Sequence, residues 1–142
     1  MMQLIPFEVA HIRSMQNYAG QETLVFSVSD QALQELKDQS DAVTAVKDNV
    51  ILGCGGVVRV NQWRCMAWGL AQRTEPRNFI LVHSAVKKFL RKQPYCRIEA
   101  FVDPMNISAL RWIELLGFKM ERAYIPYFFP NGTGASAWAM MK

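Results

Sequence analysis

A strand that leads through a tight turn into a short capped helix is the feature of this sequence that most constrains its fold. Residues 97–102 (RIEAFV) place three apolar side chains on one side, which is the period of a β-strand. Asn106 follows as a strong N-cap residue, and Gly117 suits the left-handed position that ends a helix. Strand–helix–strand alternation late in the chain predicts an α/β mixed sheet with helices on its faces.

The rest of the chain supplies elements of the same kind. Helices are expected at 76–93 and 106–116, and residues 11–36 are helix-rich with a break at Ala19-Gly20. Alternating apolar runs and turn pairs such as Asp48-Asn49 predict strands at 3–9, 42–47, 50–60, 63–71, 118–128 and 136–141. With 142 residues, we expect a single domain over 1–142, built on a central mixed sheet of about six or seven strands flanked by helices.

Charge and cysteine usage exclude several classes of protein. The formal charge of +4 without an arginine-rich run fits an anionic ligand or no charged partner, and disfavours nucleic acid. Cys54, Cys65 and Cys96 form no CxxC and sit among strand-like residues, so buried, reduced thiols in a cytoplasmic protein are expected. No apolar run reaches the ~18 residues of a membrane span, no signal-peptide pattern precedes the first strand, and no cluster has metal-ligand spacing.

Residues 106–118 (NISALRWIELLGF) carry a family resemblance. They resemble the closing helix of GNAT N-acetyltransferases, with the pattern N-x-x-A-x-x-aromatic-x-E-x-x-G-F after a strand. The order of elements extends this resemblance over 3–141. The chain is also similar to small GNAT-like proteins of tailed bacteriophages, including an internal virion protein of short-tailed phages, in its length, its glycine pair before Val57, its basic central helix and its N-x-S-x-x-R at 106–111.

The GNAT resemblance implies acetyl-CoA as the cofactor, held where a glycine-rich loop (Q/R-x-x-G-x-G/A) turns into a helix and offers backbone N–H groups to the pyrophosphate. The matching residues 73–78 read RTEPRN, with Pro76 and Asn78 where small residues are expected. Proline has no N–H to donate, so the loop is degenerate. Arg73 and Arg77 either compensate by holding phosphate or are solvated charges. The cofactor-binding residues implied are Leu70, Ala71, Arg73, Arg77, Asn78 and Asn106.

Catalytic residues are harder to assign. The family's tyrosine acid falls at Ile113, which donates no proton. Tyr124 could reach the site as an acid, or be an ordinary strand aromatic, as could Tyr127. Glu99 is a candidate base, or else a sheet carboxylate paired with a neighbour, and His83 fits a hydrogen-bonded histidine at the core edge better than a catalytic group.

Two functions remain open at this point. In the first, strands 66–71 and 98–102 splay apart to admit acetyl-CoA, backbone N–H groups near Leu70 polarise the thioester carbonyl, and an acetyl group passes to an amine acceptor. In the second, the cofactor site has decayed and the fold serves a protein partner, as in virion morphogenesis or host interaction; a homodimer is possible. The location would be the bacterial cytoplasm, or the virion if the protein is phage-encoded.

Overall fold

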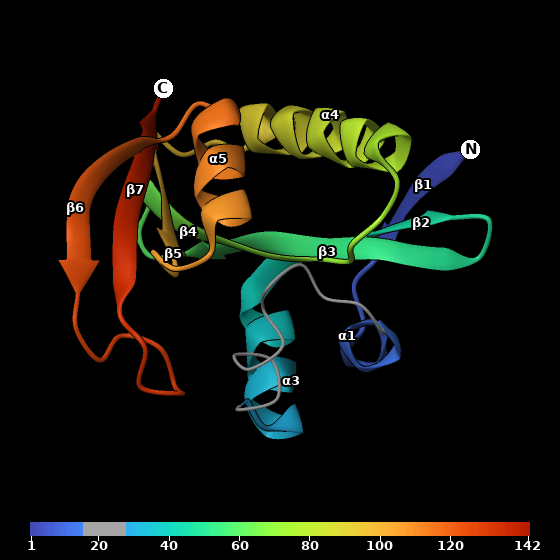
Figure 1. Cartoon of the computed structure of the whole chain (residues 1–142), viewed down its shortest axis with the longest axis horizontal. Helices are drawn as coiled ribbons and strands as arrows, with labels where there is room; N and C mark the ends of the chain where they lie inside the picture. Colours follow the sequence, from blue (N-terminus) through green and yellow to red (C-terminus); the bar gives the residue numbers. More distant parts are fainter. Residues whose placement is uncertain (16–27) are drawn as a thin grey trace.

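A seven-stranded mixed sheet forms the centre of the molecule (Figure 1), with the strand order β1-β2-β3-β4-β5-β7-β6. The computed structural model of the 142-residue chain describes residues 1–15 and 28–142. The strands are β1 (Met2–Pro6), β2 (Ser40–Lys47), β3 (Val50–Arg59), β4 (Arg64–Ala71), β5 (Arg97–Val102), β6 (Lys119–Ile125) and β7 (Ala135–Met141). The described helices are α1 (Val9–Ser14), α3 (Asp30–Gln39), α4 (Pro76–Lys92) and α5 (Ile107–Leu115). The predicted α/β class is confirmed; the predicted break at Ala19-Gly20 lies outside the described residues.

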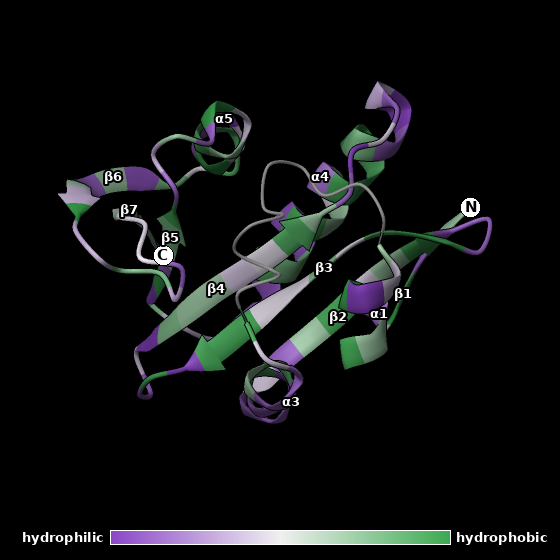
Figure 2. Cartoon of the chain, turned by 60° about the horizontal axis from the view of Figure 1, so that its bottom comes forward, coloured by the Kyte–Doolittle hydropathy of each residue, from purple (hydrophilic) through white to green (hydrophobic). Residues whose placement is uncertain are grey.

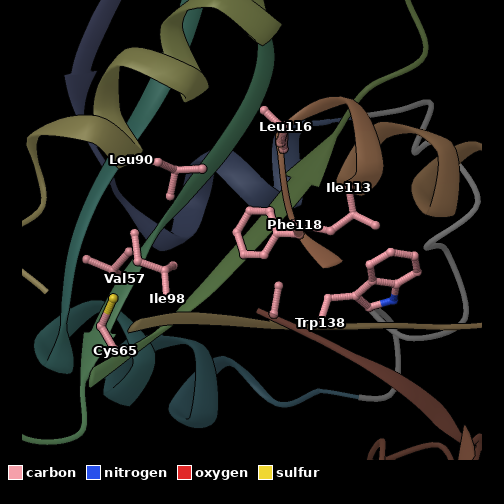
Figure 3. Close-up of a cluster of buried hydrophobic side chains, with 9 residues drawn as sticks. Val57, Cys65, Leu90, Ile98, Ile113, Leu116, Phe118 and Trp138 are labelled. Atoms are coloured by element: carbon pink, nitrogen blue, oxygen red, sulfur yellow. The ribbon is translucent and has the colours of Figure 1, made fainter. Parts of the chain in front are cut away.

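Helices cover both faces of the sheet. Figure 1 shows α4 and α5 on one face and α1 and α3 beneath β2 and β3 on the other. Viewed from the second face, α3 is largely hydrophilic (Figure 2), since only its inner side packs on the sheet through Leu33. Under α4 and α5 the largest apolar cluster contains Val57, Cys65, Leu90, Ile98, Ala100, Ile113, Leu116, Phe118 and Trp138 (Figure 3). No helix of the described residues is long and apolar enough to cross a membrane.

Local turn chemistry sets the antiparallel half of the sheet. Asp48 and Asn49 take φ values of 52° and 64° between β2 and β3, the left-handed pair that a two-residue hairpin requires. Gly56 is needed for a different reason, because a Cβ there would lie 2.4 Å from the Asp41 carbonyl oxygen. The predicted hairpin is therefore confirmed, and its backbones approach too closely for a side chain at one position.

Both helices of the α4/α5 layer begin and end where the sequence predicts. Pro76 occupies the first turn of α4, and the Asn106 side chain accepts a hydrogen bond from the Ala109 N–H at 3.2 Å to cap α5. Gly117, with φ of 102°, follows α5. The Lys142 ammonium adds a cap that the sequence did not reveal: it donates to the carbonyls of Leu90, Arg91 and Gln93 at 2.6, 2.9 and 2.6 Å, at the negative end of the α4 dipole.

Several expected boundaries were wrong. The first strand ends at Pro6 rather than residue 9, because α1 starts at Val9. The strand expected at 118–128 ends at Ile125, and Tyr127 has a φ of 51° in the following loop. The loop closes on itself, because the N–H groups of Phe128 and Phe129 both donate to the Thr133 carbonyl at 3.0 Å. Cys54 and Cys65 are buried as expected, whereas Cys96 is exposed beyond the end of α4.

Candidate functional site

The strands β4 and β5 form a wedge. Their parallel ladder holds only three pairs, from Arg64 opposite Arg97 to Met66 opposite Glu99. Beyond Met66, β4 continues to Ala71 paired with β3, while β5 continues paired with β7. The predicted divergence of residues 66–71 from 98–102 is confirmed only beyond Met66 and Glu99, because Ile98 and Glu99 are still paired with Cys65 and Met66. Beyond these three pairs, no β-ladder joins β4 to β5 in the described part of the chain.

Backbone direction along β4 determines which residues face this wedge. The Gln72 N–H donates to the Leu52 carbonyl of β3 at 2.9 Å. Because the N–H and C=O of alternate residues in an antiparallel strand point to the same side, the backbone of Leu70 also faces β3. Gly69 and Ala71 are the residues whose backbone faces the wedge. Of the two β4 residues predicted to bind the cofactor, Ala71 therefore has its backbone toward the wedge. The amide of Leu70 points toward β3 instead.

A chain of ion pairs closes the narrow end of the wedge. Glu99 is 8% exposed and accepts from the Nε of Arg64 at 2.5 Å and from the Nε of Arg97 at 2.8 Å. Arg97 also donates through Nη1 to Glu121 at 2.9 Å, and the Glu121 carboxylate forms a second bond with Nη2. These bonds raise the pKa of Arg97 and lower the pKa of Glu121. Glu99 therefore has the geometry of a paired sheet carboxylate, with both oxygens engaged.

The helix start that follows β4 offers little to a pyrophosphate. Pro76 has no N–H, and the N–H groups of Asn78 and Phe79 both donate to the Glu75 carbonyl at 3.0 and 3.1 Å. The Asn78 side chain is also engaged: it accepts from Lys47 Nζ at 2.9 Å and donates to Thr74 Oγ1 at 3.0 Å. Because Pro76 has no N–H and the Asn78 N–H is engaged by Glu75, the first turn offers fewer backbone donors to an anion than a glycine-rich turn does.

The two arginines of this segment differ from Asn78 in being exposed. Arg73 precedes the helix and Arg77 lies in its first turn. A hollow of about 360 Å³ lies beside the same turn, lined by Lys47, Asp48, Val50, Leu52, Thr74, Glu75 and Asn78. Two carboxylates, those of Asp48 and Glu75, are among its lining groups, so the hollow is not a dedicated anion site.

The candidate acid Tyr124 lies on β6, the outermost strand, with β7 between it and β5. Its side chain is 55% exposed and packs over Gly134, where an added Cβ would come within 2.2 Å of the ring. Tyr127 is 87% exposed in the loop. The structure therefore does not bring either phenol to the β4 edge, and it favours a packing role for Tyr124.

Other residues considered from the sequence have structural partners. Ile113, at the position of the family's tyrosine, is 8% exposed within the α4/α5 core. His83 accepts at Nδ1 from Trp112 Nε1 at 3.0 Å and stacks with Phe79, with ring centroids 6.1 Å apart. This is the hydrogen-bonded core-edge histidine that the sequence favoured. Asn106 uses its side-chain oxygen as the α5 cap.

Two groups near the wedge were missed from the sequence. Arg64 was not singled out, although it anchors Glu99. Phe101 follows Glu99 on the same face of β5, and its ring stacks on Phe128 with centroids 4.5 Å apart, which fixes loop 126–134 beside β5. The sequence did show that residues 97, 99 and 101 lie on one face of a strand. It could not show their partners, because these lie on strands or loops distant in sequence.

Comparison with solved structures identifies the fold. Ard1 from Thermoplasma volcanium matches with a TM-score of 0.78 at 16% identity, covering 99% of this chain and 97% of that one. An N-acetyltransferase from Staphylococcus aureus matches with a TM-score of 0.74 at 8% identity, covering 99% and 97%. Spermidine N-acetyltransferase from Vibrio cholerae, solved with CoA and spermine, matches with a TM-score of 0.69 at 14% identity, covering 99% of this chain and 95% of that one.

Neither a protein-family model nor a curated protein matches the sequence. The architecture is the GNAT N-acyltransferase fold, which a GNAT-family acetyltransferase from Bacillus anthracis also shares.

Proposed function

We propose that this protein binds acetyl-CoA in the β4/β5 wedge and transfers the acetyl group to an amine acceptor. The observation that supports the proposal is the end of the β4–β5 ladder after Met66 and Glu99, where the pantetheine arm would lie between the two diverging strands. A spermidine N-acetyltransferase of the same fold was solved with CoA and spermine, which supports an acyl-CoA and an amine as the two substrates.

The pyrophosphate end of acetyl-CoA would be held by side chains rather than by backbone. Arg73 and Arg77 are the cations next to the degenerate turn, and guanidinium groups bind phosphate oxygens through paired N–H bonds. Each lost charge-assisted bond costs about 1.5–3 kcal/mol, which corresponds to roughly one to two decades in affinity. We therefore expect weaker binding of CoA than a glycine-rich loop would give.

Positioning supplies the rate enhancement in this scheme. Glu99 is already held by two arginines, so it is poorly placed to accept a proton from the acceptor, and Tyr124 lies two strands from β5. The acceptor amine would attack the thioester carbonyl as the free base, the C–S bond would break with CoA leaving as the thiolate, and the proton lost by the amine nitrogen would pass to that thiolate. The proximity of the two substrates would lower the barrier.

Isothermal titration calorimetry with acetyl-CoA tests this function. Binding in the micromolar range that the double substitution Arg73→Ala/Arg77→Ala abolishes would support it. The matched control is Lys88→Ala/Lys92→Ala, which removes the same charge from the exposed far end of α4. Absence of heat at millimolar acetyl-CoA, with the chain folded, would exclude the acetyltransferase function.

A second candidate is a GNAT fold whose cofactor site has decayed and which acts in virion morphogenesis or host-protein interaction. Two observations favour it: Pro76 with the inward-bonded N–H groups of Asn78 and Phe79, and a buried Ile113 where the family's acid stands. Phage origin remains part of this candidate. Retention of a host or virion protein by the full chain, together with the absence of acetyl-CoA binding, is the result it requires.

A further inference from the structure

We propose that a hollow between the C-terminal half of α4 and the end of α5 binds a small monocarboxylate with an apolar body. The hollow has a volume of about 260 Å³ and lies at the opposite end of α4 from the turn at Glu75. It is lined by Lys87, Leu90 and Arg91 of α4, by Leu116 and Gly117 after α5, and by Met140 of β7. This site is separate from the wedge, so it does not depend on acyl-CoA binding.

The floor of the hollow is apolar. Leu90 and Leu116 are 5% and 7% exposed, and Figure 3 shows both side chains beside Phe118 in the α4/α5 core. Met140 is partly buried against the same core, and its flexible thioether adapts readily to the shape of a ligand. Gly117 forms part of the rim without a side chain, because its φ of 102° favours glycine. A ligand seated here has to bury a hydrocarbon surface.

The rim of the hollow is positively charged. Lys87 and Arg91 are four residues apart on α4, and therefore lie on one face of the helix, where like charges repel. In the described part of the chain, neither forms an ion pair with a carboxylate. Arg91 lies in the last turn of α4, near the negative end of the helix dipole, where Lys142 also bonds the carbonyls of Leu90, Arg91 and Gln93. An anion between Lys87 and Arg91 would relieve the repulsion.

These two features together select the ligand. A bare phosphate would satisfy the cations but leave the leucine floor without apolar contact, and a neutral hydrocarbon would do the reverse. The planar guanidinium of Arg91 matches the two oxygens of a carboxylate, and a chain of a few methylene groups extends from there over Leu90, Leu116 and Met140. Hexanoate has this chemistry and is the probe to use.

The test is a titration of the full chain followed by the ε-methyl NMR signal of Met140. Hexanoate is expected to give a saturable shift at millimolar concentration, whereas 1-hexanol and inorganic phosphate bind at least tenfold more weakly. Lys87→Met/Arg91→Met should weaken hexanoate at least tenfold. The control Lys88→Met/Lys92→Met removes two cations from the same helix outside the lining and should change the affinity by less than twofold.

Three results would overturn the proposal. The first is a Met140 signal that hexanoate leaves unshifted, and the second is a phosphate affinity equal to that of hexanoate. The third is an equal loss of hexanoate affinity in the control pair Lys88→Met/Lys92→Met, which would indicate only a diffuse positive field. If the double variant does not fold, Arg91→Lys replaces it, because it keeps the charge but loses the planar guanidinium. This variant should lower the affinity for hexanoate about threefold and leave the affinity for phosphate unchanged.

Discussion

The Nε atom of Arg64 lies 2.5 Å from Oε1 of Glu99, and this ion pair joins β4 to β5 within the short ladder that ends where the wedge opens. The second oxygen of Glu99 accepts from Arg97 at 2.8 Å. A carboxylate held from both sides fixes the separation of the two strands at the closed end. The wedge is therefore defined at its narrow end by the side chains of Arg64, Arg97 and Glu99.

Replacing Glu99 with alanine should cost about 2–3 kcal/mol of unfolding free energy, because two cations lose their partner. The arginine side chains are 39% and 29% exposed, so water screens them and the cost stays below that of a fully buried pair. Urea denaturation measures the change. Glu114→Ala, an exposed carboxylate on α5, is the control and should cost less than about 0.5 kcal/mol. Equal losses in the two variants would contradict the role of the network.

Pro76→Gly should tighten CoA binding about tenfold, because it restores an N–H at the first position of α4 at the cost of some helix rigidity. Calorimetry with CoA measures the affinity. Pro94→Gly, beyond the other end of the helix, makes the same chemical change away from the turn and should leave the affinity unchanged. An unchanged affinity in Pro76→Gly would show that the pyrophosphate does not sit at this turn.

Local signals predicted much of this fold, and long-range pairing accounts for most of what they missed. The Asp48-Asn49 hairpin, the Pro76 helix start and the Asn106 cap each depend on a few neighbouring residues, so the sequence displays them. The Arg64–Glu99 pair joins residues on two strands separated by α4, and no local pattern reveals that register. The wedge itself was expected from the GNAT resemblance rather than from any periodicity.

The candidate site was predicted less completely for related reasons. Asn78 was predicted as a cofactor-binding residue, which stays a prediction; the sequence did not show that its amide bonds Lys47 on β2 and Thr74 in the loop, contacts that depend on how the hairpin packs on α4. Cys96 was expected to be buried because it sits among strand-like residues, but it lies in the exposed connection after α4. Side-chain direction in connections is set by packing, which a single sequence does not display.

Gly56→Ala should destabilise the protein by about 1–3 kcal/mol, because the new Cβ would lie 2.4 Å from the Asp41 oxygen and 2.7 Å from the Ala42 Cα. Gly69→Ala is the matched control on the neighbouring strand: among the described residues, its Cβ comes nearest to the Cys54 oxygen, at 3.8 Å. That change should be neutral, or stabilising by up to about 1 kcal/mol. Thermal or urea unfolding compares the two, and a smaller loss in Gly56→Ala than in Gly69→Ala would contradict the close approach of β2 and β3.

Only one of the three thiols should react quickly in the folded protein. Burial raises the pKa of Cys54 to about 12 and that of Cys65 to about 11, so neither forms appreciable thiolate near neutral pH. Cys96 is exposed. Titration with a chromogenic disulfide reagent at pH 8 should show one fast equivalent, absent in Cys96→Ser, and two that appear only on unfolding. Fast reaction of a second thiol in the native chain would contradict the burial of β3 or β4.

Acid should weaken the protein through Glu121. The hydrogen bonds from Arg97, with the attraction of its charge, hold the pKa of Glu121 below the ordinary value of 4.5. A carboxyl group whose pKa is lower in the folded state contributes stability above its unfolded pKa and loses it as the pH falls through the folded pKa. Unfolding free energies of wild type and Glu121→Gln, measured by urea denaturation from pH 7 to pH 2, should therefore differ above about pH 4.5 and converge in acid.

Glu114→Gln is the control, because the Glu114 carboxylate forms no ion pair in the described structure. Its unfolding free energy should change with pH in the same way as that of the wild type. A constant difference between Glu121→Gln and wild type down to pH 2 would mean that Arg97 stabilises the β6 edge without depending on the charge of its partner.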